Sequence, residues 1–262
     1  MSYNNGGKIV NNGLTFYLDA GNPKSYDGSQ TGSWFDLGPN KYICSFTNMS
    51  GSVFTNNFWF SASLSKGTVV MNTGSQGFGV VTTPGLTYAS LGILTNAGYT
   101  LEGWCNVNNS GNRGLIIGGV GNNQGITVGY GGQPASSFNF VTWYNNTASA
   151  YVSSAASTSA NFVQTGSWYH VVGVYQYSPV QQNMIYINGI LQGTSSYSNF
   201  VSFGSVTVTV GGTNYLLGTS PSQYQYYALN GAISATRIYN RALSATEILQ
   251  NYNAHKGRFG LK

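Results

Sequence analysis

The sequence predicts an all-β protein, a β-sandwich that ends in one short C-terminal α-helix. Short alternating or apolar runs recur between clusters of Gly, Asn, Ser and Pro, which is typical of a sandwich of many short strands. Only 6% of the 262 residues are charged, whereas 15% are aromatic. This is not a disordered composition, because disorder needs low hydrophobicity together with high net charge. It suits a β-rich domain with a polar, uncharged surface.

The strands can be located from the alternation and the turn signals between them. We expect them at 14–20, 67–72, 99–107, 113–120, 125–131, 137–145, 168–177, 184–193, 206–212 and 231–240. Asn188-Gly189 separates two apolar runs and predicts a type I′ hairpin turn, which requires positive φ at both residues. The small-residue stretch 150–161 is expected to be a surface loop or a sheet edge.

Alternation within 168–177 predicts two faces for that strand. One face carries Trp168, His170, Val172 and Val174, and the other carries Tyr169, Val171 and Tyr175.

The C-terminal helix is predicted to begin after Ser244. This residue is a good N-cap, and Glu247 three positions later completes a capping box. Leu243 and Ile248 have the spacing of a hydrophobic staple. A helix this short needs tertiary packing to be stable, so we expect it to lie on the sandwich.

The packing face and the end of this helix are also predicted. An apolar stripe of Ile248, Leu249 and Tyr252 is expected to face the sandwich, and Lys256 and Gly257 to end the helix.

The closing segments resemble laminin-G-like, concanavalin A-type jelly-roll domains, especially their bacterial and viral branch. The resemblance is carried by WYHVVGVY (168–175), MIYINGILQG (184–193) and LNGAISATRIYNRALSATEILQNYN (229–253). GLTFYLDAGNPKSY, WFDLGPN and NYNAHKGRFGL are similar to the ends of such domains in tailed-bacteriophage structural proteins. The resemblance covers about residues 13–261. It implies a jelly-roll β-sandwich of residues 13–255, after a flexible arm (1–12) and before a basic tail (256–262).

The acidic residues argue against an enzyme. The chain has five, namely Asp19, Asp27, Asp36, Glu102 and Glu247. Glu247 belongs to the capping box, and Asp19 and Asp36 are expected to be hydrogen-bond anchors. Glycosidases need paired carboxylates, but the Glu-x-Asp-x-x-Glu pattern of the related glucanases is missing after Glu102. We therefore expect no catalytic residue.

Metals and cofactors are not expected either. Of the two histidines, His170 is predicted to lie in a core strand, and there is no His/Cys metal cluster. Many domains of the resembled kind bind calcium, but the acidic-residue spacing offers only Asp27 in its segment.

Other partner classes are excluded by charge and hydropathy. The net charge of +5 includes no basic cluster interleaved with aromatics, so we expect no nucleic acid. The N-terminus lacks the apolar core of a signal peptide, and no run reaches the roughly 18 apolar residues of a membrane span. We expect a protein assembled in the cytoplasm of a host, without membrane insertion.

Two functions remain. The first is a non-enzymatic virion structural protein of a tailed bacteriophage, a multicopy capsid-decoration or appendage subunit on the virion surface that contacts other virion proteins. Its candidate docking residues are Lys256, Arg258 and Lys262. The alternative is a carbohydrate-binding adhesin for host surface glycans. Its candidate ligand-binding residues are Asn122, Asn123, Tyr130, Trp143 and Tyr144.

Overall fold

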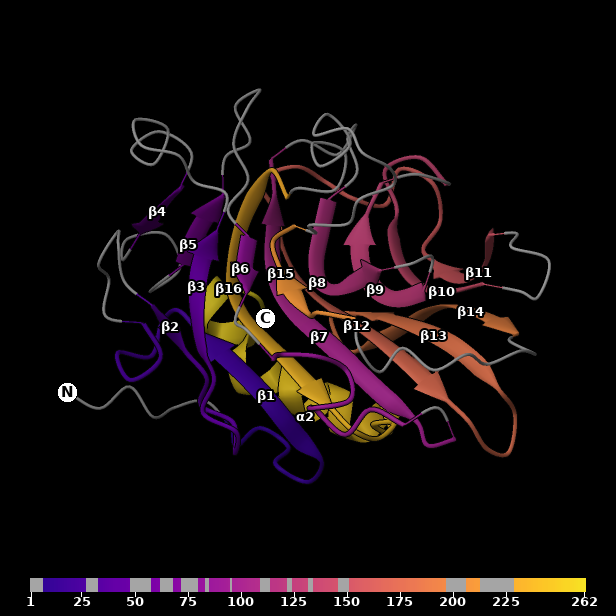
Figure 1. Ribbon diagram of the computed structural model, residues 1–262. Coiled ribbons are helices and arrows are strands. Elements are labelled where there is room, and N and C mark those ends of the chain that lie inside the picture. The colour runs from indigo at the N-terminus through magenta and orange to yellow at the C-terminus, as the bar shows by residue number, and fades with distance from the viewer. Residues whose placement is uncertain are drawn as a thin grey trace.

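Two antiparallel sheets face each other in the computed structural model, and the C-terminal helix lies against one of them (Figure 1). The structure describes residues 7–26, 33–47, 58–61, 68–71, 80–82, 85–94, 96–108, 114–121, 124–131, 134–145, 151–196, 206–212 and 229–262. Within these ranges each sheet has eight strands.

The sheet next to the helix is here called the helix-side sheet. Its order is β14-β13-β12-β7-β16-β5-β4, and β1 also pairs with β16. The strands are β1 (Leu14–Asp19), β4 (Phe58–Ser61), β5 (Thr68–Met71), β7 (Tyr99–Val107), β12 (Trp168–Gln176), β13 (Gln182–Ile187), β14 (Ile190–Ser196) and β16 (Gly231–Tyr239).

The other sheet is here called the opposite sheet, with the order β11-β10-β9-β8-β15-β6-β3-β2. The strands are β2 (Trp34–Phe35), β3 (Ile43–Thr47), β6 (Val80–Thr82), β8 (Gly114–Gly121), β9 (Gln124–Tyr130), β10 (Phe138–Asn145), β11 (Tyr151–Ser157) and β15 (Thr209–Val210).

Most of the predicted strands are confirmed, and the small-residue stretch forms β11 at one edge of the opposite sheet. Four strands were not predicted, namely β2, β3, β4 and β6. They have two to five residues, which is too short for the alternation of apolar and polar residues to be recognised. Of the strand expected at 206–212, only the two residues of β15 form a strand. The hairpin turn is as predicted, with φ of 53° at Asn188 and 82° at Gly189.

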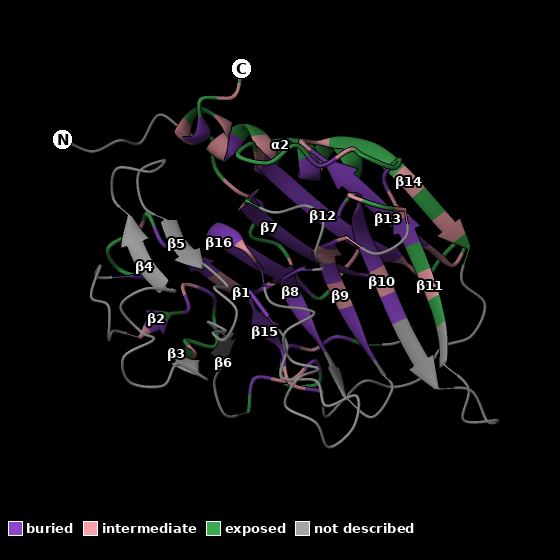
Figure 2. Ribbon diagram, turned by 90° about the horizontal axis from the view of Figure 1, so that it is seen from above, coloured by how far each residue is buried: buried purple, intermediate pink, exposed green. Residues whose placement is uncertain are grey.

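The main core lies between the sheets, and a second buried layer lies between the helix-side sheet and the helix (Figure 2). Strand β12 shows both, because Tyr169, Val171 and Tyr175 pack between the sheets while Val172 and Val174 pack toward Leu243 and Ile248. The predicted alternation of this strand is therefore confirmed.

Helix α2 (Ala245–His255) begins as predicted. The hydroxyl of Ser244 accepts from the amide of Glu247, the Glu247 carboxylate accepts from the amide of Ser244, and both staple residues, Leu243 and Ile248, are buried.

The packing face of α2 differs from the prediction. The buried residues are Ile248, Asn251 and Ala254, whereas Leu249 is 44% exposed. Hydropathy places an asparagine on the solvent side of a helix. Asn251, however, has buried polar partners beneath the helix, and these contacts hold the Asn251 face of the helix against the sheet.

The C-terminal segment is not a separate tail. The chain continues from α2 into a 3-10 helix, η3 (Lys256–Phe259), in which Phe259 is buried. The left-handed residue that ends it is Gly260, with φ of 72°, and not the predicted Gly257. Residues 256–259 therefore follow the helix directly.

Residues 7–12 of the predicted N-terminal arm contact the helix. The Val10 side chain is buried and its amide donates to Asn251 Oδ1 at 2.8 Å, while the Lys8 carbonyl accepts from Gln250 Nε2 at 2.8 Å. This part of the arm lies along α2.

Candidate functional site

A buried polar cluster lies between the helix-side sheet and α2. Glu102 of β7 and Arg237 of β16 are cross-strand neighbours, and their side chains form a buried ion pair. His170 Nε2 lies 3.5 Å from Glu102 Oε2, and Asn251 Nδ2 donates to the same oxygen at 2.9 Å. Both carboxylate oxygens therefore have internal partners.

The charge state of Glu102 follows from this setting. Burial alone would raise its pKa, but the Arg237 guanidinium and His170 lower the pKa to about 2. The carboxylate is thus ionised and enclosed by α2. A catalytic acid or base must reach its substrate within hydrogen-bond distance, so this geometry favours a structural role for Glu102.

A second ion pair fastens the end of the chain to β1. Arg258 Nη1 donates to Asp19 Oδ1 at 2.6 Å, and His255 Nε2 lies 3.9 Å from Asp19 Oδ2. Burial raises the pKa of Asp19, but Arg258 and His255 bring it below its usual value. Burial and the Arg237 guanidinium, 2.9 Å from His255 Nδ1, lower the pKa of His255 to about 3.

The three predicted docking residues consequently differ in what they offer. Arg258 is engaged with Asp19, so it is not a free contact for a partner. The Lys256 ammonium lies 5.7 Å from the centre of the Tyr252 ring, and Lys262 is exposed.

An aromatic cluster holds the same segment. The Phe259 ring stacks on Trp104 with a centroid distance of 4.3 Å and contacts Trp168 at 4.6 Å. Trp104 also stacks on His170 at 5.0 Å. The C-terminus is therefore built into the outer layer of the fold.

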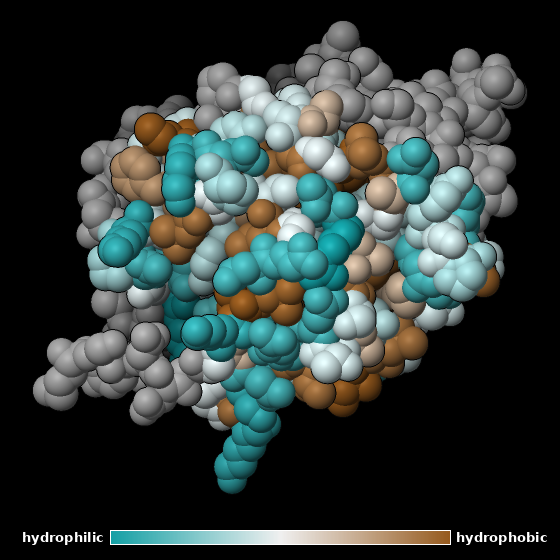
Figure 3. All heavy atoms as spheres, turned by 90° about the horizontal axis from the view of Figure 1, so that it is seen from below, coloured by the Kyte–Doolittle hydropathy of each residue, from teal (hydrophilic) through white to brown (hydrophobic). Residues whose placement is uncertain are grey.

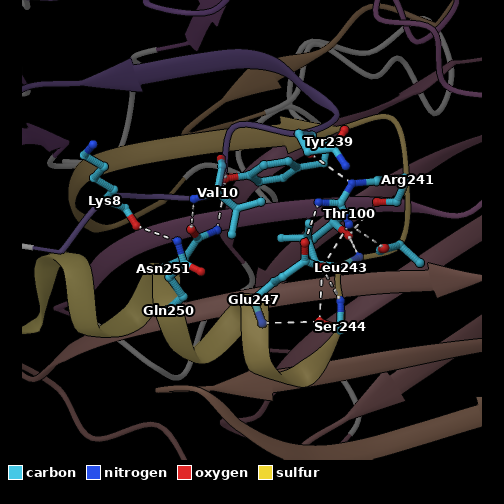
Figure 4. Close-up of polar contacts among 12 residues, drawn as sticks. Lys8, Val10, Thr100, Tyr239, Arg241, Leu243, Ser244, Glu247, Gln250 and Asn251 are labelled. Atoms are coloured by element: carbon cyan, nitrogen blue, oxygen red, sulfur yellow. Dashed lines mark hydrogen bonds and ion pairs between the residues drawn. The ribbon is translucent and has the colours of Figure 1, made fainter.

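Polar contacts at the start of α2 complete this layer (Figure 4). Arg241 Nη2 and Nη1 donate to Glu247 Oε1 and Oε2 at 2.6 and 2.9 Å. The Thr100 hydroxyl donates to the Arg241 carbonyl at 2.9 Å and accepts from the Leu243 amide at 3.0 Å. The contacts of Arg241 and Thr100 thus attach the start of the helix to the sheet.

The hydrogen-bond anchors that we predicted are confirmed. Asp36 accepts from the amides of Tyr17, Gly38 and Tyr42, and Asp19 accepts from the amide of Gly21. All four acidic residues in the described part of the chain therefore have structural partners, while Asp27 lies outside the described residues.

Of the five predicted ligand-binding residues, only Tyr130 has a side chain in the described part of the chain. Tyr130 is buried between the sheets, and its hydroxyl accepts from the Asn230 amide at 3.2 Å, so its ring cannot serve as an exposed sugar platform. It follows an inward-facing pattern with Ile126 and Val128 that alternation along 125–131 could have revealed. Trp143 and Tyr144 lie in β10, and only their backbone is described; Asn122 and Asn123 lie outside the described residues.

The outer face of β9, β10 and β11 is nevertheless ordered in rows by the strand register. One row places Asn139 between Gly129 and Ser157, the next Val141 between Thr127 and Ala155, and the third Trp143 between Gly125 and Ser153. Phe138 and Phe140 face the core between these rows. Ser153 and Ala155 are exposed, and Thr127, Val141 and Ser157 are partly exposed.

Charge is partitioned between the two sheets. No Asp, Glu, Lys or Arg lies between Arg113 and Arg237, a span that contains β8 to β15. None of the described strands of the opposite sheet contains such a residue. The helix-side sheet instead contains Asp19, Glu102 and Arg237, and the surface on the side of α2 mixes hydrophilic with hydrophobic residues (Figure 3).

Metal and membrane motifs add nothing to this description. No group of three or more His, Cys, Asp or Glu side chains in the described ranges is arranged to hold a metal ion. Among the helices described, none is long and apolar enough to span a membrane.

Solved structures with a similar fold include binding domains of toxins and a domain of an enzyme. The binding domain of Paraclostridial Mosquitocidal Protein 1 has a TM-score of 0.61 and 14% identity, over 95% of this chain and 55% of that chain. The binding domain of Botulinum Neurotoxin DC, in complex with SialylT, has a TM-score of 0.58 and 16% identity, over 94% and 52% of the two chains. This chain thus spans about half the length of these toxin domains.

A third similar structure matches over its whole length. Domain 4 of AbnA, an extracellular arabinanase from Geobacillus stearothermophilus, in complex with arabinotriose, has a TM-score of 0.58 and 15% identity, over 93% of this chain and 100% of that one. At these identities the likeness concerns the fold alone.

Sequence comparison identifies the family. A comparison with curated proteins finds no match. Residues 75–249 match the family model described as the concanavalin A-like lectin/glucanases superfamily, which is more than half of the chain. Together with the two eight-stranded sheets, this match shows that the chain belongs to the laminin-G-like branch of the concanavalin A-like lectin/glucanase superfamily.

Proposed function

We propose that the chain is a non-enzymatic carbohydrate-binding domain whose ligand is an uncharged glycan. The observation that carries this proposal is the partition of charge, which leaves the strands of the opposite sheet without any acidic or basic residue in the described part of the chain. Acidic sugars are bound through arginine or lysine, whereas neutral sugars need amides, hydroxyls and apolar surface.

The outer face of β9, β10 and β11 offers this chemistry. Thr127, Ser153 and Ser157 carry hydroxyls, and Val141 supplies partly exposed apolar surface. Position 143 has the same parity as 139 and 141, so strand alternation predicts that it belongs to the same face. The backbone of this position pairs with Gly125 and Ser153.

The basic residues on the other side are less suited to an acidic ligand. Arg237, Arg241 and Arg258 are paired with Glu102, Glu247 and Asp19. The fold relative solved with arabinotriose, an uncharged oligosaccharide, supports the same ligand class.

The absence of catalysis is part of the proposal. Glu102 is enclosed by partners under α2, and Glu247 pairs with Arg241 at the start of the helix. We also propose that binding needs no metal, so that a chelator leaves it unchanged.

Glycan-array binding at two salt concentrations tests the function. We expect signals for neutral glycans that change little between low and high salt, because ion pairs contribute little. Ala155→Glu, an exposed change on the proposed face, should weaken binding at least about tenfold, since it places an unpaired charge in the interface. Asn253→Glu, an exposed change on α2, is the matched control and should bind normally.

Two results would contradict this proposal. The absence of any array signal opposes carbohydrate binding, and a signal confined to sialylated or sulfated glycans opposes the neutral ligand class. Loss of binding in Trp143→Ala, with its fold intact by circular dichroism, would support the third row as part of the site.

A second proposal concerns the setting of the domain, a structural subunit on the surface of a tailed-bacteriophage virion. It is supported by the resemblance of GLTFYLDAGNPKSY and NYNAHKGRFGL to phage structural proteins. Quantitative mass spectrometry of purified particles tests it. A decoration subunit would be present in numbers comparable with the capsid protein, an adhesin in far fewer copies, and absence from particles would refute the proposal.

A further inference from the structure

The outermost strand of the helix-side sheet, β14, has an edge that no described strand covers. It pairs with β13 alone, and no backbone hydrogen bond joins it to any other described segment. Its sequence, ILQGTSS, contains neither a charge nor a proline. Ile190 is 63% exposed and Leu191 46% exposed.

Such an edge is unusual in a folded protein. Unpaired N–H and C=O groups on an edge strand act as a template for another chain, and proteins block them with lysines, prolines or bulges placed to deny pairing. Strand β14 is seven residues long, largely exposed and without lysine or proline, and its one irregularity is a register shift against β13 between Leu191 and Gly193. This favours an edge that is covered in the functional assembly.

The outermost strand of the opposite sheet ends at the same side of the sandwich. Strand β11 pairs with β10 alone and, with the sequence YVSSAAS, is also free of charge and proline. The Ser154 and Ser195 hydroxyls lie 2.8 Å apart, and a side chain at Gly193 would collide with the Ser157 carbonyl. Figures 1 and 2 both show β11 and β14 together at one end of the molecule.

We propose that a second copy of this chain covers this side, with β14 of the two copies paired antiparallel across a two-fold axis. The helix-side sheet then runs continuously through the dimer, and β11 of each copy flanks the same contact. A two-fold contact brings identical surfaces together, and two uncharged edges approach without repulsion.

The occupant is a second copy rather than an extended peptide because both β14 and β11 have only one strand neighbour among the described residues. A single added strand would satisfy β14 and leave β11 uncovered. A second copy brings its own β14 and β11, so one association covers four edges. It also removes the exposed aliphatic side chains of Ile190 and Leu191 from water.

Charge insertion on β14 tests the contact. Leu191 and Thr194 pair with Tyr186 and Met184, which share one buried cluster, so both point to the same face of the sheet. In the dimer, Leu191→Lys/Thr194→Lys would bring four lysines together on that face, and like charges on paired strands repel. We expect the dimer Kd to rise at least about tenfold.

The control makes the same two substitutions elsewhere. Leu94, 59% exposed, and Thr246 of α2 lie outside both edge strands. Leu94→Lys/Thr246→Lys adds equal charge and should leave the dimer Kd unchanged. Sedimentation equilibrium gives each Kd, and hydrogen exchange at two protein concentrations should show that the amides within Leu191–Ser196 that do not donate to β13 are protected only in the dimer.

The outcomes separate the occupants. A wild-type dimer that the β14 lysines dissociate and the control lysines do not supports the proposal. A chain that stays monomeric at high concentration overturns it, as does a dimer that resists the β14 lysines. A monomer whose β14 amides are protected by an added extended peptide also overturns it, in favour of strand addition by another protein.

Discussion

Replacing Glu102 by Gln removes the counter-ion of a buried arginine while keeping the shape of the side chain. Glu102 and Arg237 are almost fully buried, and Arg237 lies between β7, β1 and α2 with no other acid as close in the described residues. Breaking a buried ion pair on one side costs about 3–5 kcal/mol, because the remaining charge stays desolvated. A domain has a total stability of about 5–15 kcal/mol, so this single change would remove a large part of it.

Equilibrium unfolding in urea, followed by tryptophan fluorescence, measures the effect. Glu102→Gln should lower the free energy of unfolding by about 3 kcal/mol or more, and Arg237→Met by a similar amount. The double variant should lose at least about 2 kcal/mol less than the two single losses added together, because no unpaired charge remains.

The surface pair provides the control. Glu247→Gln acts on the partly exposed Arg241–Glu247 pair and should cost about 1 kcal/mol. The reasoning is refuted if Glu102→Gln costs no more than this control, or if the effects of the two buried substitutions simply add.

Three further predictions concern the C-terminal layer and the hairpin. The pKa of His255 is lowered from 6.5 to about 3, so the unfolded chain takes up the proton first. Stability should therefore fall as the pH drops from about 6.5 to 3, by at most about 1.4 kcal/mol per pH unit for this group. The lowered pKa of Glu102 adds a further loss of stability below about pH 4.5. A Tm that does not change from pH 6.5 to 4 would oppose this account. So would a pH dependence of stability that is unchanged in His255→Gln. Phe259→Ala should cost about 3 kcal/mol in urea unfolding because its ring fills the space beside Trp104; no loss would mean that the segment is dispensable. Gly189→Ala should lower the stability by about 1 kcal/mol, since φ is +82° and the added carbon would lie 2.9 Å from Leu249 Cδ1, and an unchanged Tm would contradict the strain.

Local signals in the sequence were sufficient for the elements whose cause is local. The capping box at Ser244, the turn at Asn188-Gly189 and the alternation of β12 depend on neighbouring residues, and all three are confirmed. The anchors Asp19 and Asp36 were also predictable. The inward position of Tyr130, a candidate sugar residue, was missed, because the packing of the two sheets decides which face of a strand is buried; the other four candidates stay predictions.

What the sequence by itself determined is therefore the class of fold and its last helix, since periodicity and composition act over short distances. Only the tertiary structure decided that Asn251 faces inward, that Arg258 reaches Asp19, and that β14 and β11 end at the same side. These facts join residues that are far apart along the chain. The physical reason is that a buried charge or an open strand edge selects its partner by proximity in space, which hydropathy along the chain does not encode.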